Sequence, residues 1–148
     1  MEQANDFLED SRQLLNLMTD RTEADFQIKT QFKGWTINDV IGHLHIFNFA
    51  ANLSLQSSNK FQTFFAPISA DLNKGVSLIE TQRPWLKGLS GYGLLDAWWS
   101  EVQTVAKKFK NANPKSRLKW AGPDLSAWSN ITARQMETWA HSQEVLIF

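Results

Sequence analysis

The chain has 148 residues, which is enough for one domain with a hydrophobic core. Fifteen basic residues balance fifteen acidic ones, so the charge favours neither nucleic acid nor an acidic membrane surface as a partner. The absence of cysteine excludes disulfides, thiolate ligands and thiolate nucleophiles, and it is compatible with a cytoplasmic protein. The N-terminus is too polar for a signal peptide, and no apolar run is long enough to span a bilayer.

Two helices are predicted in the first part of the chain, from apolar residues at helical spacing. The first covers residues 2–19 and the second covers residues 36–57. The second begins with a strong capping signal, because Thr36 can serve as the N-cap and Asp39 follows three residues later. In the polar connection between the two helices, alternation around residues 26–32 indicates a short extended piece.

Proline, glycine and serine punctuate the rest of the chain. We expect Pro67 to interrupt it and a third helix to run from residue 70 to about 82, before a break that contains proline and glycine. A fourth helix is predicted over residues 92–110. A loop with two prolines and a glycine follows, and the final helix is expected to begin at Asp124 or Ser126.

The final helix carries two rows of side chains at helical spacing. The apolar residues are predicted to share one broad face: Trp128, Ile131, Met136, Trp139, Val145 and Leu146. The ionisable residues form a second row: Arg134, Glu137, His141 and Glu144. Such a row is usually a solvated face, but in a helix this apolar we expect it to face inward, where charges need a partner or a metal ion.

Glu137 and His141 are four residues apart, so on a helix they lie on one face and can chelate a single metal ion. The pair alone is weak evidence, because Glu and His at this spacing usually form a solvated pair. A third ligand could come from the second helix, which holds His43 and His45. These two lie roughly 200° apart around the helix axis, so both cannot point at one ion. A lone histidine on an apolar face is more often a hydrogen-bonded core residue.

The segments Gly34-Trp35-Thr36, Asp39-Val40 and His43-Leu44 resemble the tryptophan-threonine-to-histidine signature of the DinB/YfiT-like metalloenzyme superfamily. Residues 120–123 and 133–145 resemble an uncharacterised metal-binding subgroup of that superfamily. Within that superfamily, the sequence is most similar to the metal-binding domain of mycothiol-dependent maleylpyruvate isomerase. The resemblance implies an all-α, up-and-down four-helix bundle that forms a single domain over residues 1–148.

The resemblance further implies that His43, Glu137 and His141 are metal ligands and that His45 is not. Two imidazoles and one carboxylate suit zinc, and also nickel, iron(II) or manganese, with positions left open for water or substrate. Three neighbours are candidates for orienting these ligands: Asp39 beside His43, Arg134 beside Glu137, and Glu144 beside His141. Each of the three could equally be an ordinary surface or capping residue. No residue stands out as a catalytic base.

Enzymes of the resembled branch use a low-molecular-weight thiol, such as mycothiol or bacillithiol, as a cosubstrate. The resemblance therefore implies a metal-bound thiolate that attacks an electrophilic small molecule, in a transferase or isomerase reaction. The isomerase has a further C-terminal domain that is absent here, so isomerisation of maleylpyruvate itself is not expected. The end at Phe148, inside a helix, indicates a chain that was cut or whose remainder is missing.

Three other hypotheses remain open. A metal-bound hydroxide would be enough for a hydrolase. The chain could instead be a metal-binding module without catalysis. It could also be an interaction bundle whose seven tryptophans supply a homodimer interface, in which case the three ligands would lie too far apart to share an ion.

Overall fold

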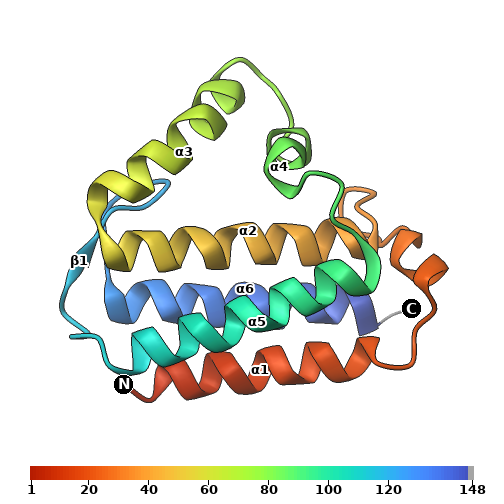
Figure 1. Cartoon of the computed structure of the whole chain (residues 1–148), viewed down its shortest axis with the longest axis horizontal. Helices are drawn as coiled ribbons and strands as arrows, with labels where there is room; N and C mark the ends of the chain where they lie inside the picture. The colour runs from red at the N-terminus through yellow and green to blue at the C-terminus, as the bar shows by residue number, and fades with distance from the viewer. Residues whose placement is uncertain (147–148) are drawn as a thin grey trace.

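Four long helices lie side by side in the computed structural model, which describes residues 1–146 (Figure 1). They are α1 (Gln3–Met18), α2 (Ile37–Gln56), α5 (Gly91–Lys110) and α6 (Ala127–Leu146). Both α1 and α2 pack against α5 and α6. The expected all-α four-helix bundle is confirmed, and the bounds of these four helices agree closely with the predicted ones.

Two further helices, α3 (Ser58–Asn73) and α4 (Leu78–Leu86), lie outside the bundle and pack against α2. In Figure 1 they form the arch above α2, and they return the chain to the end of the bundle at which α2 begins. As a result α5 runs in the same direction as α2, whereas α1 and α6 run in the opposite direction. The up-and-down alternation is therefore interrupted once, at this crossover.

The third helix predicted over residues 70–82 is wrong. Pro67 lies inside α3, which is capped by the Ser57 hydroxyl, and the chain breaks instead at Gly75, whose φ is +89°. A proline removes one backbone hydrogen bond but does not stop a helix whose other bonds and caps are in place. A positive φ is accessible to glycine at little cost, so Gly75 is the natural place for the turn.

Short elements fill the other connections. The segment before α2 holds the 3-10 helix η1 (Glu23–Gln27) and a single antiparallel bridge between Lys29 and Thr36. The expected extended piece is therefore present, but it is reduced to one bridge. Before α6, the two-residue strands β1 (Arg117–Leu118) and β2 (Leu125–Ser126) pair antiparallel.

The start of α6 is fixed by Ser126, whose hydroxyl oxygen accepts the Ser129 N–H at 3.0 Å. This result selects Ser126 over Asp124 as the capping residue. The core beneath the helices is apolar, and its largest fully buried side chains include Trp98, Phe7, Phe26 and Phe109. Within residues 1–146, none of the helices combines the length and the apolar character needed to cross a membrane.

The single apolar face predicted for α6 is wrong. Ile131 and Val145 are buried in the core, whereas the other apolar residues of the row are exposed: Trp128, Met136, Trp139 and Leu146. At about 100° per residue the two sets lie on different sides of the helix. The inward side is shared by Ile131, Val145 and the ionisable row, so Arg134 and His141 are buried as expected. Trp128 and Trp139 are exposed on α6, where they could contact a second copy of the chain. The homodimer stays a prediction.

The capping box at the start of α2 predicts a measurable stability effect. The Thr36 hydroxyl oxygen accepts the Asp39 N–H, and the Asp39 carboxylate accepts the Thr36 N–H, both at 3.0 Å. We expect Thr36→Ala to lower the free energy of unfolding by about 1 kcal/mol, as measured by urea denaturation. Ser90→Ala is the matched control, because the Ser90 side chain makes no capping hydrogen bond. Equal losses in the two variants would contradict the prediction.

Candidate metal centre

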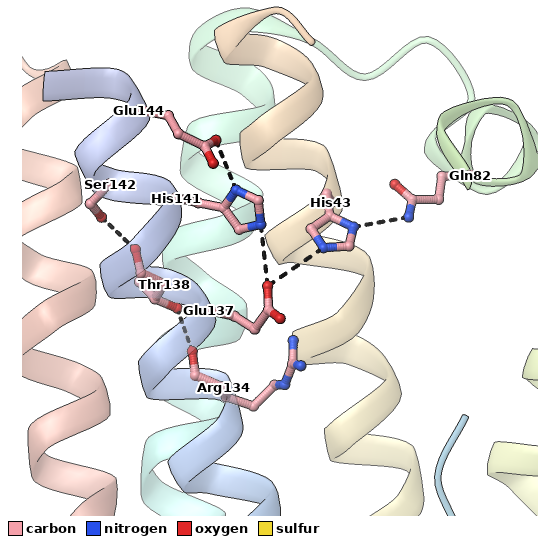
Figure 2. Close-up of polar contacts among 8 residues, drawn as sticks. All are labelled: His43, Gln82, Arg134, Glu137, Thr138, His141, Ser142 and Glu144. Atoms are coloured by element: carbon pink, nitrogen blue, oxygen red, sulfur yellow. Dashed lines mark hydrogen bonds and ion pairs between the residues drawn. The ribbon is translucent and has the colours of Figure 1, made fainter. Parts of the chain in front are cut away.

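Three side chains from two helices converge near one end of the bundle, as Figure 2 shows: His43 of α2, and Glu137 and His141 of α6. Each offers one ligand atom, and these atoms all lie within 4.8 Å of one another. Oε2 of Glu137 is 3.2 Å from Nε2 of His141 and 4.0 Å from Nε2 of His43. The side-by-side packing of α2 and α6 therefore completes the pair that helical spacing alone provides.

Aromatic rings enclose the two imidazoles. Trp35, just before the cap of α2, stacks on His141 with ring centroids 6.0 Å apart and meets His43 edge-on at 5.2 Å. Phe32 contacts His141 edge-on at 5.3 Å, and Phe47 contacts His43 at 5.0 Å. These rings bury both histidines, while the side chain of Glu137 keeps 45% of its surface exposed. Glu137 is therefore the member of the cluster through which solvent or a ligand reaches it.

The second ring nitrogen of each histidine is already engaged. Nδ1 of His141 lies 2.9 Å from Oε2 of Glu144, which is the contact expected from the sequence. Nδ1 of His43 lies 3.1 Å from Nε2 of Gln82, a residue of α4 that the sequence analysis did not identify. The Asp39 carboxylate makes a different contact from the expected one, because it belongs to the capping box of α2. Both Nε2 atoms are thus left facing Glu137 (Figure 2).

The side-chain amide of Gln82 can accept a hydrogen bond from Nδ1 of His43. A histidine that offers Nε2 to a metal ion keeps its proton on Nδ1 and needs an acceptor there. Oε1 of Gln82 is buried and has no hydrogen-bond partner among residues 1–146. A half-turn of the amide exchanges its oxygen and nitrogen, so that Oε1 accepts the Nδ1–H of His43 and no longer lacks a partner.

Local electrostatics set the charge of each member of the cluster. Burial, followed by the charges of His141 and Arg134, lowers the pKa of His43 to about 3, so this imidazole is neutral at physiological pH. The hydrogen bond from His141 lowers the pKa of Glu137 more than burial raises it. Burial lowers the pKa of His141, but its hydrogen bonds to Glu137 and Glu144 outweigh burial and raise it.

Arg134 lies one turn before Glu137 and is only 5% exposed. Its guanidinium carbon is 5.6 Å from the ring centroid of Phe47 and 5.2 Å from that of Trp120. Nε and Nη1 have no hydrogen-bond partner within the described residues, so the expected grip of Arg134 on Glu137 is limited to its charge. Burial lowers the pKa of Arg134 to about 10, which leaves the group cationic at neutral pH.

His45 points away from the cluster, as the angular argument requires. Its ring packs 5.1 Å from Trp85 of α4, and its Nδ1 is buried without a partner. Both histidines of α2 are buried to the same extent, so burial alone does not distinguish them. What distinguishes His43 is its direction toward α6.

The donor set and spacing fit a divalent metal ion. Bonds of about 2.0–2.1 Å in a tetrahedral zinc site place neighbouring ligand atoms about 3.3 Å apart. The Glu137–His141 spacing of 3.2 Å already meets this requirement. The other spacings, 4.0 Å between Glu137 and His43 and up to 4.8 Å between the two imidazoles, are longer, so the Glu137 side chain and the rings must move closer together to bind an ion.

The all-α bundle has the fold of the DinB/YfiT-like superfamily, and it holds a His/Glu/His cluster between α2 and α6. Residues 7–146 match the family model of the mycothiol maleylpyruvate isomerase N-terminal domain, and the chain belongs to that family. The match covers α2 to α6 in full and α1 from residue 7 onward.

Individual relatives agree with this assignment. Two uncharacterised proteins of Mycobacterium tuberculosis, from strains CDC 1551 / Oshkosh and ATCC 25618 / H37Rv, are each 29% identical over 116 residues, which is 78% of this chain and 44% of theirs. The crystal structure of the mycothiol-dependent maleylpyruvate isomerase superposes with a TM-score of 0.70 at 15% identity, covering 97% of this chain and 59% of that one. A histidine-to-alanine mutant of that enzyme gives 0.66 at 13% identity.

The chain spans about half the length of the relatives that it matches. At such low identities, the similarity to the solved structures shows the fold alone.

The buried histidines predict a pH dependence of stability. Burial lowers the pKa of His45 from 6.5 to about 4, so between these values the unfolded chain binds a proton that the folded chain does not. In metal-free protein the free energy of unfolding should therefore fall as the pH drops from 6.5 toward 4. Urea denaturation across this range should give a shallower slope for His45→Gln, with the other shifted groups, His43, Glu137 and His141, setting the remainder. An unchanged slope would contradict the assignment.

Proposed function

We propose that this chain is the metal-binding domain of an enzyme that uses a small thiol to attack an electrophilic small molecule. The observation that carries the proposal is the arrangement of the two imidazoles, with both Nε2 atoms facing Glu137 and both Nδ1 atoms engaged by other side chains. Three protein ligands leave coordination positions open, which is characteristic of catalytic sites rather than closed structural ones. Zinc is the proposed ion, with nickel, iron(II) and manganese as the alternatives.

The thiol is supported by the family and by the composition of the chain. A solved protein of the same fold is a mycothiol-dependent maleylpyruvate isomerase, and this chain has no cysteine of its own. The reacting sulfur would therefore belong to a cosubstrate. A divalent ion in this site would lower the pKa of a bound thiol and stabilise its thiolate at neutral pH.

Each residue of the cluster then has a distinct task. His43 supplies a neutral imidazole, His141 a second one, and Glu137 a negative charge that partly neutralises the ion. Gln82 and Glu144 hold the two rings in orientation, as the partners of metal-bound histidines commonly do. The aromatic rings of Trp35 and Phe32 keep water from the buried side of the cluster, so a ligand approaches along the exposed Glu137 side.

The first test is elemental analysis by inductively coupled plasma mass spectrometry. We expect about one equivalent of a divalent metal ion in the wild type, loss of it in His43→Ala and His141→Ala, and retention in His45→Ala. His45→Ala is the matched control because it removes a histidine from the same helix that faces away from the cluster. A wild type without metal, even after reconstitution, would refute the metal centre.

The same preparations, loaded with cobalt(II), then test the thiol. Addition of a thiol should produce a sulfur-to-cobalt charge-transfer absorption in the wild type and in His45→Ala. A site that binds cobalt but shows no spectral change with any thiol would favour a hydrolase or a non-catalytic metal-binding module instead.

The contact between Gln82 and His43 gives a further prediction. Because Gln82 orients the His43 ring, Gln82→Ala should weaken metal affinity by about 10- to 100-fold, the usual effect of losing such a partner. Competition with a metal-sensitive chromophore measures the affinity. Asp39→Asn is the control, since Asp39 caps α2 without touching His43, and its metal affinity should stay near that of the wild type. Equal weakening in both variants would show that Gln82 acts only through stability.

A further inference from the structure

Arg134 is a buried cation, and two of its three side-chain nitrogens lack a hydrogen-bond partner within the described residues. It is 5% exposed, and the two nitrogens are Nε and Nη1. A buried guanidinium group is costly unless its N–H groups are paired. Such a group, next to a candidate metal centre, calls for an explanation outside the packing of the helices.

Two aromatic rings lie next to the guanidinium group of Arg134. The rings of Phe47 and Trp120 lie 5.6 Å and 5.2 Å from the guanidinium carbon, as in cation–π contacts. These ring contacts do not satisfy the N–H groups, so Nε and Nη1 remain available to a hydrogen-bond acceptor. A carboxylate binds a guanidinium group edge to edge.

Within residues 1–146, no hydrogen bond joins a carboxylate to Nε or Nη1 of Arg134. Glu137 is the acidic group whose charge offsets the burial of Arg134. Its Oε2 atom, however, faces the two imidazoles, at 3.2 Å and 4.0 Å (Figure 2). In the proposed metal centre that carboxylate is a ligand and shares its charge with the ion. The guanidinium group and the ion together then give the site a net positive charge.

We propose that Arg134 binds the carboxylate of a small molecule whose other end reaches the metal centre. This inference rests on the proposed function, since it concerns the ligand of the same site. Trp120 follows β1 in the loop before β2 and is only half-buried, so it is the side chain that can shift to admit the carboxylate. The carboxylate belongs either to the thiol cosubstrate or to the electrophile, and binding experiments distinguish these sources.

Isothermal titration calorimetry on zinc-loaded protein provides the test, with two thiols of equal length as probes. 3-Mercaptopropionate carries a carboxylate, whereas 3-mercapto-1-propanol carries a hydroxyl group. We expect the wild type to prefer the carboxylate by about 10- to 100-fold, the range for a hydrogen bond to a charged group. Arg134→Gln should abolish the preference, and Arg134→Lys should reduce it, because lysine lacks the planar fork.

Lys33→Gln is the matched control. Lys33 is an exposed cation near the cluster whose charge contributes to lowering the pKa of His43, and its removal should leave the preference nearly unchanged. A preference that survives in Arg134→Gln would mean that the metal ion holds the carboxylate, which overturns the proposal. Equal weakening of both thiols in Arg134→Gln would make Arg134 a positioning residue for Glu137, and this also overturns it. If Arg134→Gln does not fold, Arg134→Lys decides by the same criterion.

Succinate, which has carboxylates but no thiol, separates the two sources. Saturable binding of succinate by the wild type and not by Arg134→Gln would support an electrophile with a carboxylate, and binding of 3-mercaptopropionate alone would support the thiol. Bound carboxylate should also change the tryptophan fluorescence of the wild type, and Trp120→Phe should lose this change.

Succinate binding by metal-free protein tests Arg134 even if no metal binds, so failure of the metal centre and failure of this inference are distinguishable. No binding of either carboxylate overturns the proposal.

Discussion

The packing of α2 against α6 is the constraint on which the site depends. One helix supplies Glu137 and His141 at the spacing of a single turn, and the other supplies His43 opposite them. The apolar residues on the inward side of α6 hold this face against the core, so Arg134 and His141 are buried together with them, while Glu137 stays half-exposed. The cluster is therefore a product of core packing and does not depend on a flexible loop for its ligand atoms.

The crossover between α2 and α5 lies outside the bundle but also helps to position the site. α4 packs against α2 through Trp85, which touches both His45 and Phe49, and the same helix places Gln82 beside His43. A helix outside the four-helix core thus sets the orientation of a side chain inside it. The crossover that interrupts the up-and-down alternation is consequently part of the site, not only a connection.

The long helices could be predicted from the sequence because their signals are local. Thr36 and Asp39 mark a cap within four residues, and periodicity marks the faces. The residues alone could not choose between His43 and His45, which are equally buried and differ only in direction; the resemblance to a known family made that choice. Gln82 could not be predicted, because its contact with His43 joins residues 39 positions apart and the helix that holds it was misplaced around Pro67.

The outer face of α6 shows a second limit of prediction from the sequence. Periodicity identifies which apolar residues share a side of a helix, but not which side meets the core. Ile131 is buried and Trp139 is 55% exposed, although both are large and apolar. The deciding factor is the neighbour against which each packs, and a single sequence does not contain that information.

The hydrogen bond between Glu137 and His141 affects how the site binds a metal ion. By raising the pKa of His141 and lowering that of Glu137, it favours a proton on the imidazole opposite a negative carboxylate. Where the imidazole carries this proton, an incoming divalent ion displaces it, because only the neutral ring coordinates a metal ion. Uptake of the ion becomes an exchange of one positive species for another. The apo domain can thus stay folded without leaving an uncompensated negative charge beneath its aromatic rings.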